Sequence, residues 1–311
     1  MTPGALTGVL PVVSTPFDAT DDIDAEVLAG EVDWLISCGV DGLVVAMVSE
    51  VLRLTEAERR ALTSAVVVAA GGRVPVVASV GAESTKAAVA FAVHAERAGA
   101  AALMAIPPVA VELKDAEIAA YFGAILQAVE IPLVVQDASG YLGRPLSLDL
   151  YLGLLDEHGP DRVLFKPEAP PTGPRLSALR DATGGRARVF EGTGGAALVD
   201  SHRRGVVGTM PGPEVAWAVV ELWRALARGD AAAVAAIHGP LAGLVSLQTS
   251  LDAFVAAEKH LLVRQGVFVS DLRRRPYGYV LDAETIIEID RLFRLLCDAV
   301  PARPIPSSSP R

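Results

Sequence analysis

The chain alternates between short apolar runs and longer segments with helical periodicity, and this alternation constrains its fold most. Apolar runs of four to six residues recur along the first two thirds of the chain, and an amphipathic segment follows each one. Strands this apolar are buried on both faces, as in a parallel sheet covered by helices. The expected strands are 8–13, 42–46, 75–80, 101–106, 132–136, 162–166, 188–191 and 206–209. The expected helices are 24–38, 55–70, 84–98, 114–129, 147–157, 174–183, 194–204 and 213–228.

Eight strand–helix repeats predict an α/β fold in which the sheet closes into a (β/α)8 TIM barrel. We place this barrel at residues 7–228. A doubly wound open sheet is the competing architecture, and it is less favoured because no Gly-x-Gly-x-x-Gly motif follows the first run.

The alternation stops after Arg228. Segments 230–247, 252–265 and 283–299 have helical periodicity, so a C-terminal helical extension is expected over residues 229–300. The last segment, 301–311, is rich in proline and serine and is expected to be a disordered tail.

Composition excludes several classes of protein. A net charge of −10 gives no electrostatic reason to bind nucleic acid or an anionic membrane. Cys38 and Cys297 are too few for a disulfide framework, and the five histidines show no metal-ligand spacing, so we predict no metal. The N-terminus lacks a basic region followed by an apolar core, and no apolar stretch would span a bilayer. A cytoplasmic location is therefore expected.

Lys166 is the leading candidate for chemistry. It ends the apolar run 162–166 and precedes Pro167 and Glu168, at the strand end where barrels of this kind hold their active sites. Burial disfavours the charged form of a lysine, and the neutral amine is the form that attacks a ketone. The alternative is a strand-end lysine that extends its charged group into water. Among the residues at the eight strand ends, Lys166 is the one suitable amine.

Several motifs, in order, resemble one known family over residues 7 to 300. They are Gly8-Val9-Leu10-Pro11-Val12-Val13-Ser14-Thr15-Pro16-Phe17, Asp41-Gly42-Leu43, Ser49-Glu50, Leu54-Thr55-Glu56-Ala57-Glu58-Arg59, Ile131-Pro132-Leu133-Val134-Val135, Val163-Leu164-Phe165-Lys166, Gly266-Val267 and Asp271-Leu272-Arg273. The sequence is similar to the dihydrodipicolinate synthase and N-acetylneuraminate lyase family, the pyruvate-type class I aldolases. The resemblance implies that Lys166 forms a Schiff base with a small 2-keto acid. It also implies a homo-oligomer, a tetramer or a dimer, and no cofactor beyond the covalent lysine imine.

The chain departs from the family at the residues that support this lysine. Residues 46–50 read Ala-Met-Val-Ser-Glu where members carry Gly-Thr-Thr-Gly-Glu or Gly-Ser-Thr-Gly-Glu, so Met47 and Val48 replace both hydroxyls. The relay tyrosine falls on Gln136, the arginine near it on Tyr141, and the second tyrosine near Val109. A glutamine does not shuttle protons as a phenol does. We therefore expect an activity other than dihydrodipicolinate synthesis or sialic acid cleavage.

Other residues would then support the lysine. Glu168 lies two positions beyond Lys166 and shares its strand face, so it is either a general acid/base or the partner in a structural ion pair. Tyr141 is a second candidate proton carrier, or an aromatic ring packed beneath a loop. Asp137 is expected to cap a loop. The predicted substrate-binding residues are Val48, Ser49, Gln136, Gly192 and Thr193.

Two functions remain open from the sequence. The leading hypothesis is a Schiff-base lyase, an aldolase or dehydratase, acting on a 2-keto acid whose binding site is less polar than usual because of Met47, Val48 and Val109. The alternative is a ligand-binding barrel that keeps the fold and the lysine but has lost turnover.

Overall fold

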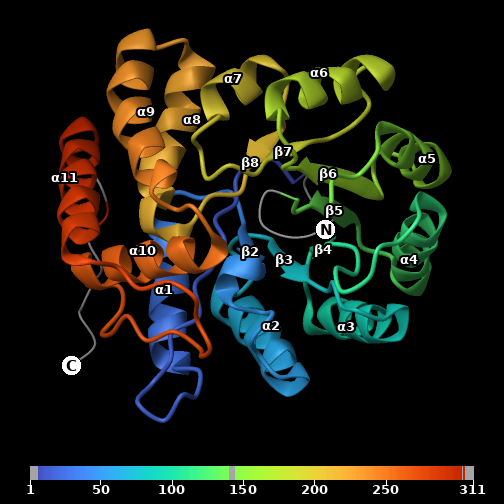
Figure 1. The fold of residues 1–311 in the computed structure, drawn as a ribbon, viewed down its shortest axis with the longest axis horizontal. Coiled ribbons are helices and arrows are strands. Elements are labelled where there is room, and N and C mark those ends of the chain that lie inside the picture. Colours follow the sequence, from blue (N-terminus) through green and yellow to red (C-terminus); the bar gives the residue numbers. More distant parts are fainter. Residues whose placement is uncertain (1–5, 140–143, 303, 305–311) are drawn as a thin grey trace.

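The computed structural model describes residues 6–139, 144–302 and 304. These residues form a closed (β/α)8 barrel with additional helices at its C-terminal end (Figure 1). The strands are β1 (Gly8–Val9), β2 (Leu43–Val45), β3 (Val76–Ser79), β4 (Ala102–Ala105), β5 (Leu133–Asp137), β6 (Val163–Pro167), β7 (Phe190–Glu191) and β8 (Gly208–Thr209). The predicted fold class is confirmed.

All strand pairs in the barrel are parallel and join neighbours around a ring. Strands β2 to β6 follow one another in one ladder, and β1, β8 and β7 form the other. Single bridges close the two gaps, Val12 to Val44 and Phe165 to Val189. The carboxyl ends of all eight strands therefore lie at one mouth of the barrel.

The surrounding helices match the predicted pattern, with differences at their ends. They are α1 (Ala25–Ser37), α2 (Glu56–Ala70), α3 (Thr85–Ala98), α4 (Asp115–Ala128), α5 (Leu148–His158), α6 (Thr172–Ala182), α7 (Leu198–Arg203) and α8 (Ala216–Arg228), with short 3-10 turns η1 (Met47–Ser49) and η2 (Pro213–Val215). Helix α2 begins with a capping box in which Thr55 and Glu58 exchange hydrogen bonds.

Two predicted elements are much shorter in the structure. The helix expected over 194–204 begins only at Leu198, because Gly194 and Gly195 have φ values of 65° and 94°, which an α-helix does not accommodate. The strand expected over 8–13 is regular only at Gly8–Val9. Beyond it Pro11 has no N–H to donate, although its carbonyl still accepts from Val44.

The two faces of each strand belong to different parts of the core. Leu164 lies in the cluster that fills the barrel interior, whereas Phe165 packs against the outer helices. Val134 and Val135 divide in the same way on β5. Because side chains alternate along a strand, position 166 faces the interior with Leu164.

The C-terminal extension consists of α9 (Ala231–Ser246), α10 (Leu251–Arg264) and α11 (Ala283–Ala299). Helix α9 packs on α8 and α11, while α10 contacts η1 and η2 at the barrel mouth. Figure 1 shows these helices gathered on the α1 and α8 side of the barrel. Within the described part of the chain, no helix combines the length and apolar character needed to cross a membrane.

A fully buried ion pair joins the extension to the barrel. Lys259 of α10 donates to Glu50 Oε1 at 2.6 Å and to the carbonyls of Thr15 and Leu272 at 2.8 and 2.6 Å. Glu50 follows η1 and has a φ of 57°, the left-handed region, and its other oxygen accepts from the Arg274 N–H at 2.9 Å. All three Lys259 donors are thereby used, so this lysine is structural.

We expect Glu50→Gln to lower the free energy of unfolding by about 3–5 kcal/mol, because it leaves the Lys259 charge buried without a counter-charge. The control is Asp156→Asn, which breaks the exposed pair with Arg186 (54% and 67% exposed side chains) and is expected to cost under about 1 kcal/mol. Urea denaturation measures both. Equal small losses would contradict the structural role of the Lys259–Glu50 pair.

Candidate active site

Lys166, Glu168 and Gln136 meet inside the barrel at the carboxyl ends of β5 and β6. Lys166 Nζ donates to Glu168 Oε1 at 2.6 Å, and both side chains are almost fully buried. Gln136, paired in register with Lys166, directs its amide to both Glu168 oxygens at 3.3 Å. The carboxylate of Glu168 is therefore held between an amine and an amide.

Burial raises the pKa of Glu168 above its ordinary value, while the charge and hydrogen bond of Lys166 act in the opposite direction. Moving the shared proton from Nζ to Glu168 leaves a neutral amine beside a carboxylic acid, with no change in total charge. Burial makes the charged form of Glu168 costly, so its carboxyl is suited to holding that proton. This contact is consequently suited to releasing an amine nucleophile.

The amine borders a small cavity of about 30 Å³ at the barrel mouth. The barrel supplies polar lining through Gln136, Lys166 and Glu168, whereas most of the remaining wall is apolar or glycine. That wall consists of Val12, Ala46, Met47, Val48, Gly192, Gly194, Met210, Pro211, Gly212, Leu251 and Phe254. Of the predicted substrate-binding residues, Val48, Gln136 and Gly192 thus lie on the cavity.

Gly192 allows the chain after β7 to approach the reactive pair closely. A Cβ at this position would lie 2.6 Å from Glu168 Oε1 and 3.0 Å from Lys166 Cε. Any larger residue would displace both side chains, so a backbone surface without a side chain faces the amine here.

Two predicted substrate-binding residues direct their side chains elsewhere. The Ser49 hydroxyl is fully buried, donates to the Val13 carbonyl and accepts from the Ala46 N–H at 3.1 Å, which fixes the η1 turn. The Thr193 hydroxyl donates to Glu191 and accepts from the Ala197 N–H at 2.9 Å at the entrance to α7. Neither is among the described residues lining the cavity.

Asp137 caps the loop after β5, as the sequence predicted. Its two oxygens accept from the Ser139 and Leu146 N–H groups, each at 3.0 Å, and so hold the two ends of the loop. The Tyr151 hydroxyl also reaches Asp137, at 3.4 Å. Tyr141, the second predicted proton carrier, lies outside the described residues.

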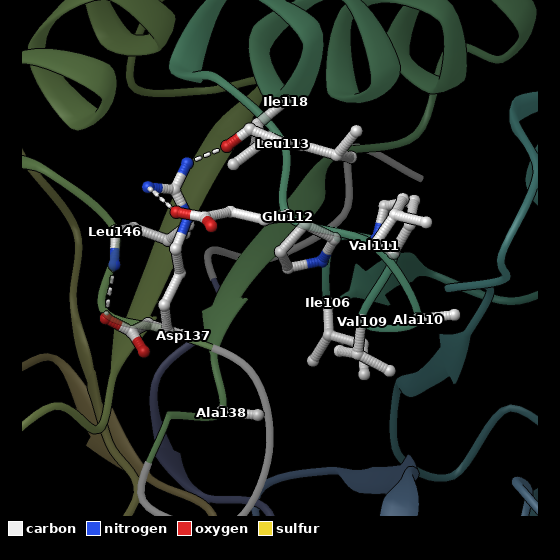
Figure 2. Close-up of a pocket in the computed structure, with 13 residues that line it drawn as sticks. Ile106, Val109, Ala110, Val111, Glu112, Leu113, Ile118, Asp137, Ala138 and Leu146 are labelled. Carbon is white, nitrogen blue, oxygen red and sulfur yellow. Dashed lines mark hydrogen bonds and ion pairs between the residues drawn. The ribbon is translucent and has the colours of Figure 1, made fainter.

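A second, larger cavity of about 290 Å³ opens between the loops that follow β4 and β5 (Figure 2). Its wall is mainly apolar, with Glu112 and Arg144 at the edge; the Arg144 guanidinium donates to the Leu113 carbonyl. Ile106 and Ala138 line this cavity and pack against Met47, which lines the first. An apolar partition of these three side chains therefore lies between the two cavities.

The contribution of α10 to the site was not predicted from the sequence. Leu251 and Phe254 line the cavity beside Lys166 from the helical extension, more than 80 residues after Lys166 along the chain. The sequence contained one signal for this contact, the two adjacent charged residues Glu258 and Lys259 in an otherwise apolar helical segment. In the structure both are fully buried. Charges on the buried side of a helix indicate a specific contact.

Among the residues that the structure describes, no group of three or more His, Cys, Asp or Glu side chains is arranged to hold a metal ion. The absence of a metal cofactor stays a prediction from the sequence. The amine–carboxylic acid chemistry described above uses protein groups alone.

Comparisons to known proteins identify the family of this chain. The model of the Dihydrodipicolinate synthetase family matches residues 5–288. This chain belongs to that family. It is 30% identical over 277 residues to L-2-keto-3-deoxyarabonate dehydratase from Azospirillum brasilense, covering 86% of this chain and 88% of the relative. It is also 31% identical over 185 residues to 4-hydroxy-tetrahydrodipicolinate synthase from Rhizobium meliloti, covering 59% and 58%.

Solved structures of family members share the fold. The dihydrodipicolinate synthase of Rhodopseudomonas palustris superposes with a TM-score of 0.85 at 23% identity, covering 94% of this chain and 98% of that one. A prophage protein of the same family from E. coli K12, solved in complex with pyruvate, gives 0.85 at 24% identity, covering 94% and 99%. The family supports a lyase of the Schiff-base class I aldolase type for this chain.

We expect Gly192→Ala to lower the free energy of unfolding by about 1–3 kcal/mol, because the added methyl group has to displace Glu168 and Lys166. Gly153→Ala in α5 is the matched control: its Cβ meets nothing within 4 Å, and alanine in a helix is expected to stabilise by about 0.5–1 kcal/mol. Thermal or urea unfolding measures both. A Gly192→Ala protein as stable as the wild type would contradict the close approach.

Proposed function

We propose that this protein is a lyase that binds a 2-keto acid as a Schiff base on Lys166. The observation that carries the proposal is the buried amine at the carboxyl end of β6, 2.6 Å from an acid whose pKa burial raises, on the wall of a cavity. Family membership gives independent support, since relatives include a keto-deoxy sugar acid dehydratase.

Glu168 is suited to the proton transfers of imine formation. The neutral amine attacks the keto carbon, the nitrogen then gives up a proton, and the carbonyl oxygen takes one up, which gives a carbinolamine with a neutral nitrogen and a hydroxyl. Glu168 then donates a proton to that hydroxyl, which leaves as water, and the nitrogen lone pair forms the C=N bond of a protonated imine. The 2.6 Å contact between Lys166 Nζ and Glu168 Oε1 supports this role for Glu168.

The protonated imine withdraws electrons from the adjacent carbon, C3. A base removes a C3 proton to give an enamine, and the enamine electrons then expel a leaving group from C4. If C4 carries a hydroxyl, protonation of that hydroxyl and loss of water complete a dehydration. In the aldol direction, a proton is instead removed from the C4 hydroxyl, the C3–C4 bond breaks, and its electrons enter the enamine. Similarity to a dehydratase over most of the chain favours dehydration.

The walls of the cavity favour a substrate with a compact keto-acid end. Met47, Val48 and Met210 offer no hydroxyl, so the carboxylate would be received by backbone N–H groups at Met47 and Val48 and of the chain around Gly192. With about 30 Å³ beside the amine, a longer substrate would need movement of the Met47–Ile106–Ala138 partition to reach the second cavity. Tyr141 remains a predicted proton carrier for this end, and assembly as a dimer or tetramer remains a prediction.

One observation favours the alternative, a ligand-binding barrel without turnover. The Gln136 amide hydrogen-bonds both oxygens of Glu168, and an amide at that position relays no proton. This alternative keeps the fold and the lysine, and it differs from the lyase in that no product is formed.

Borohydride trapping tests the proposal directly, because the chain has only four lysines. We expect incubation with pyruvate or 2-keto-3-deoxy sugar acids, followed by reduction, to add one substrate mass at Lys166, measured by intact mass and peptide mapping. Lys86 and Lys114 are exposed and Lys259 is fully buried, so none should react specifically. The control Lys114→Met should retain the adduct and Lys166→Met should lose it. No adduct across a panel of 2-keto acids would contradict the Schiff-base lyase.

Measuring water loss or keto-acid release with the same panel of 2-keto acids then separates the lyase from the ligand-binding barrel. Turnover identifies the lyase, while trapping without turnover identifies the binding barrel.

A further inference from the structure

Three glutamate side chains from distant segments are buried together beneath α10. They are Glu31 of α1, Glu214 of η2 and Glu258 of α10, each at most 1% exposed. The three carboxyls are close enough to repel one another when charged: Glu31 and Glu258 both interact with Glu214, and Glu258 also interacts with Glu31. We call these three residues the carboxyl cluster.

Hydrogen bonds satisfy only a small part of the carboxyl cluster. Glu31 Oε1 accepts from the Ser14 N–H at 2.8 Å, and Glu214 Oε1 accepts from Gln248 Nε2 at 3.1 Å. Within the described part of the chain, Glu31 Oε2 and Glu214 Oε2 have no hydrogen-bond partner, and the Ser14 hydroxyl is the one donor that faces Glu258. The buried Gln248 Oε1 beside them also lacks a partner. Acceptors this poorly supplied with donors are costly to bury as anions.

The surrounding charges do not neutralise the carboxyl cluster. Lys259 is the cation that faces it, but its ammonium already binds Glu50 and two carbonyls. Among the described residues, this one ammonium therefore interacts with three buried carboxyls, those of Glu50, Glu31 and Glu258, and none of these interactions reaches Glu214. Burial raises the pKa of Glu31 and Glu258 well above the ordinary value and that of Glu214 to about 7, and repulsion from Glu214 and Glu31 further raises the pKa of Glu258.

The carboxyl cluster lies directly behind the wall of the catalytic cavity. Gly212 lines that cavity, and a Cβ there would lie 2.2 Å from Glu214 Oε2 and 2.9 Å from Phe254 Cζ. On α10, Glu258 follows Phe254 by four residues, so the two side chains lie on one face of the helix. The carboxyl cluster thus lies next to Phe254, one of the side chains that α10 contributes to the cavity.

We propose that the carboxyl cluster is a proton-dependent latch that seats α10 on the barrel mouth and positions Leu251 and Phe254 on the catalytic cavity. In the protonated form, carboxylic acids supply the donors that the poorly satisfied oxygens lack. Loss of protons places like charges between α1, η2 and α10, and their repulsion loosens α10. The latch belongs to the folding of this chain and does not depend on the reaction that the cavity serves.

The direction of the pH effect follows from the raised pKa values. A carboxyl whose pKa is raised by folding contributes stability below its unfolded value, near 4.5, and this contribution is lost as the pH rises through the folded value. For each proton held only by the folded state, the unfolding equilibrium constant rises about tenfold per pH unit. The wild type should therefore lose stability between pH 5 and 8, where ordinary carboxylates no longer titrate.

The experiment compares urea unfolding of wild type, Glu258→Gln and the exposed control Glu284→Gln at intervals from pH 5 to 9. Glutamine has the shape of glutamic acid but no ionisable group, so Glu258→Gln should reduce the pH dependence by about tenfold per pH unit and be more stable than wild type at pH 8. Glu284→Gln, on the surface of α11, should follow the wild type. Hydrogen exchange at residues 251–264, corrected for intrinsic rates, should increase from pH 6 to pH 8.5 in the wild type and less in Glu258→Gln.

Parallel pH profiles for wild type and Glu258→Gln, or α10 exchange independent of pH, would overturn the latch. If Glu258→Gln does not fold, the pH dependence of urea unfolding is measured on Glu31→Gln instead, with the same expected reduction. Because these readouts need neither substrate nor turnover, a failed borohydride experiment leaves the latch intact, and a failed latch leaves the Schiff base intact.

Discussion

The proposed function depends on one interaction, the contact between Lys166 and Glu168. The sequence that produces this contact is unusual for a buried strand. After the apolar Leu164, the next two positions on the interior face are an amine, Lys166, and a carboxyl, Glu168. Because the sheet is closed, the interior face of this strand ends at the barrel mouth. Gly192 has no side chain, so the backbone after β7 can lie next to Lys166 and Glu168. The strand sequence, the closure of the sheet and the glycine after β7 thus each contribute to the placement of the Lys166 amine beside the Glu168 carboxyl.

Two buried lysines show how the same side chain serves different purposes. Lys259 donates to three oxygens and is surrounded by protein, so its ammonium has no free direction in which to react. Lys166 donates to Glu168 and borders a cavity. Among the described residues, Lys166 therefore differs from Lys259 in having one hydrogen-bond partner and open space beside its amine, and these features support its proposed role as the nucleophile.

The strand and helix pattern was predictable from the sequence because buried parallel strands and amphipathic helices leave strong periodic signals, as at 132–136 and 55–70. Lys166 and the loop-capping Asp137 were predictable for the same reason, since the alternation of strand faces assigns their directions. The side-chain directions of Ser49 and Thr193 were not, because a hydroxyl beside a turn satisfies the backbone as readily as a ligand. The contribution of Phe254 and the carboxyl cluster depend on how α10 docks, a tertiary contact that local pattern does not encode.

The central claim is that Lys166 forms an imine whose neighbouring carbon becomes acidic. Proton NMR of 2-ketobutyrate in D2O measures this most directly, since its C3 protons exchange with solvent when an enzyme-bound imine and a base interconvert it with the enamine. We predict exchange catalysed by the wild type, absent in Lys166→Met and slowed by about 10²–10⁴-fold in Glu168→Gln. Wild-type exchange no faster than in buffer, or exchange retained in Lys166→Met, would contradict the claim.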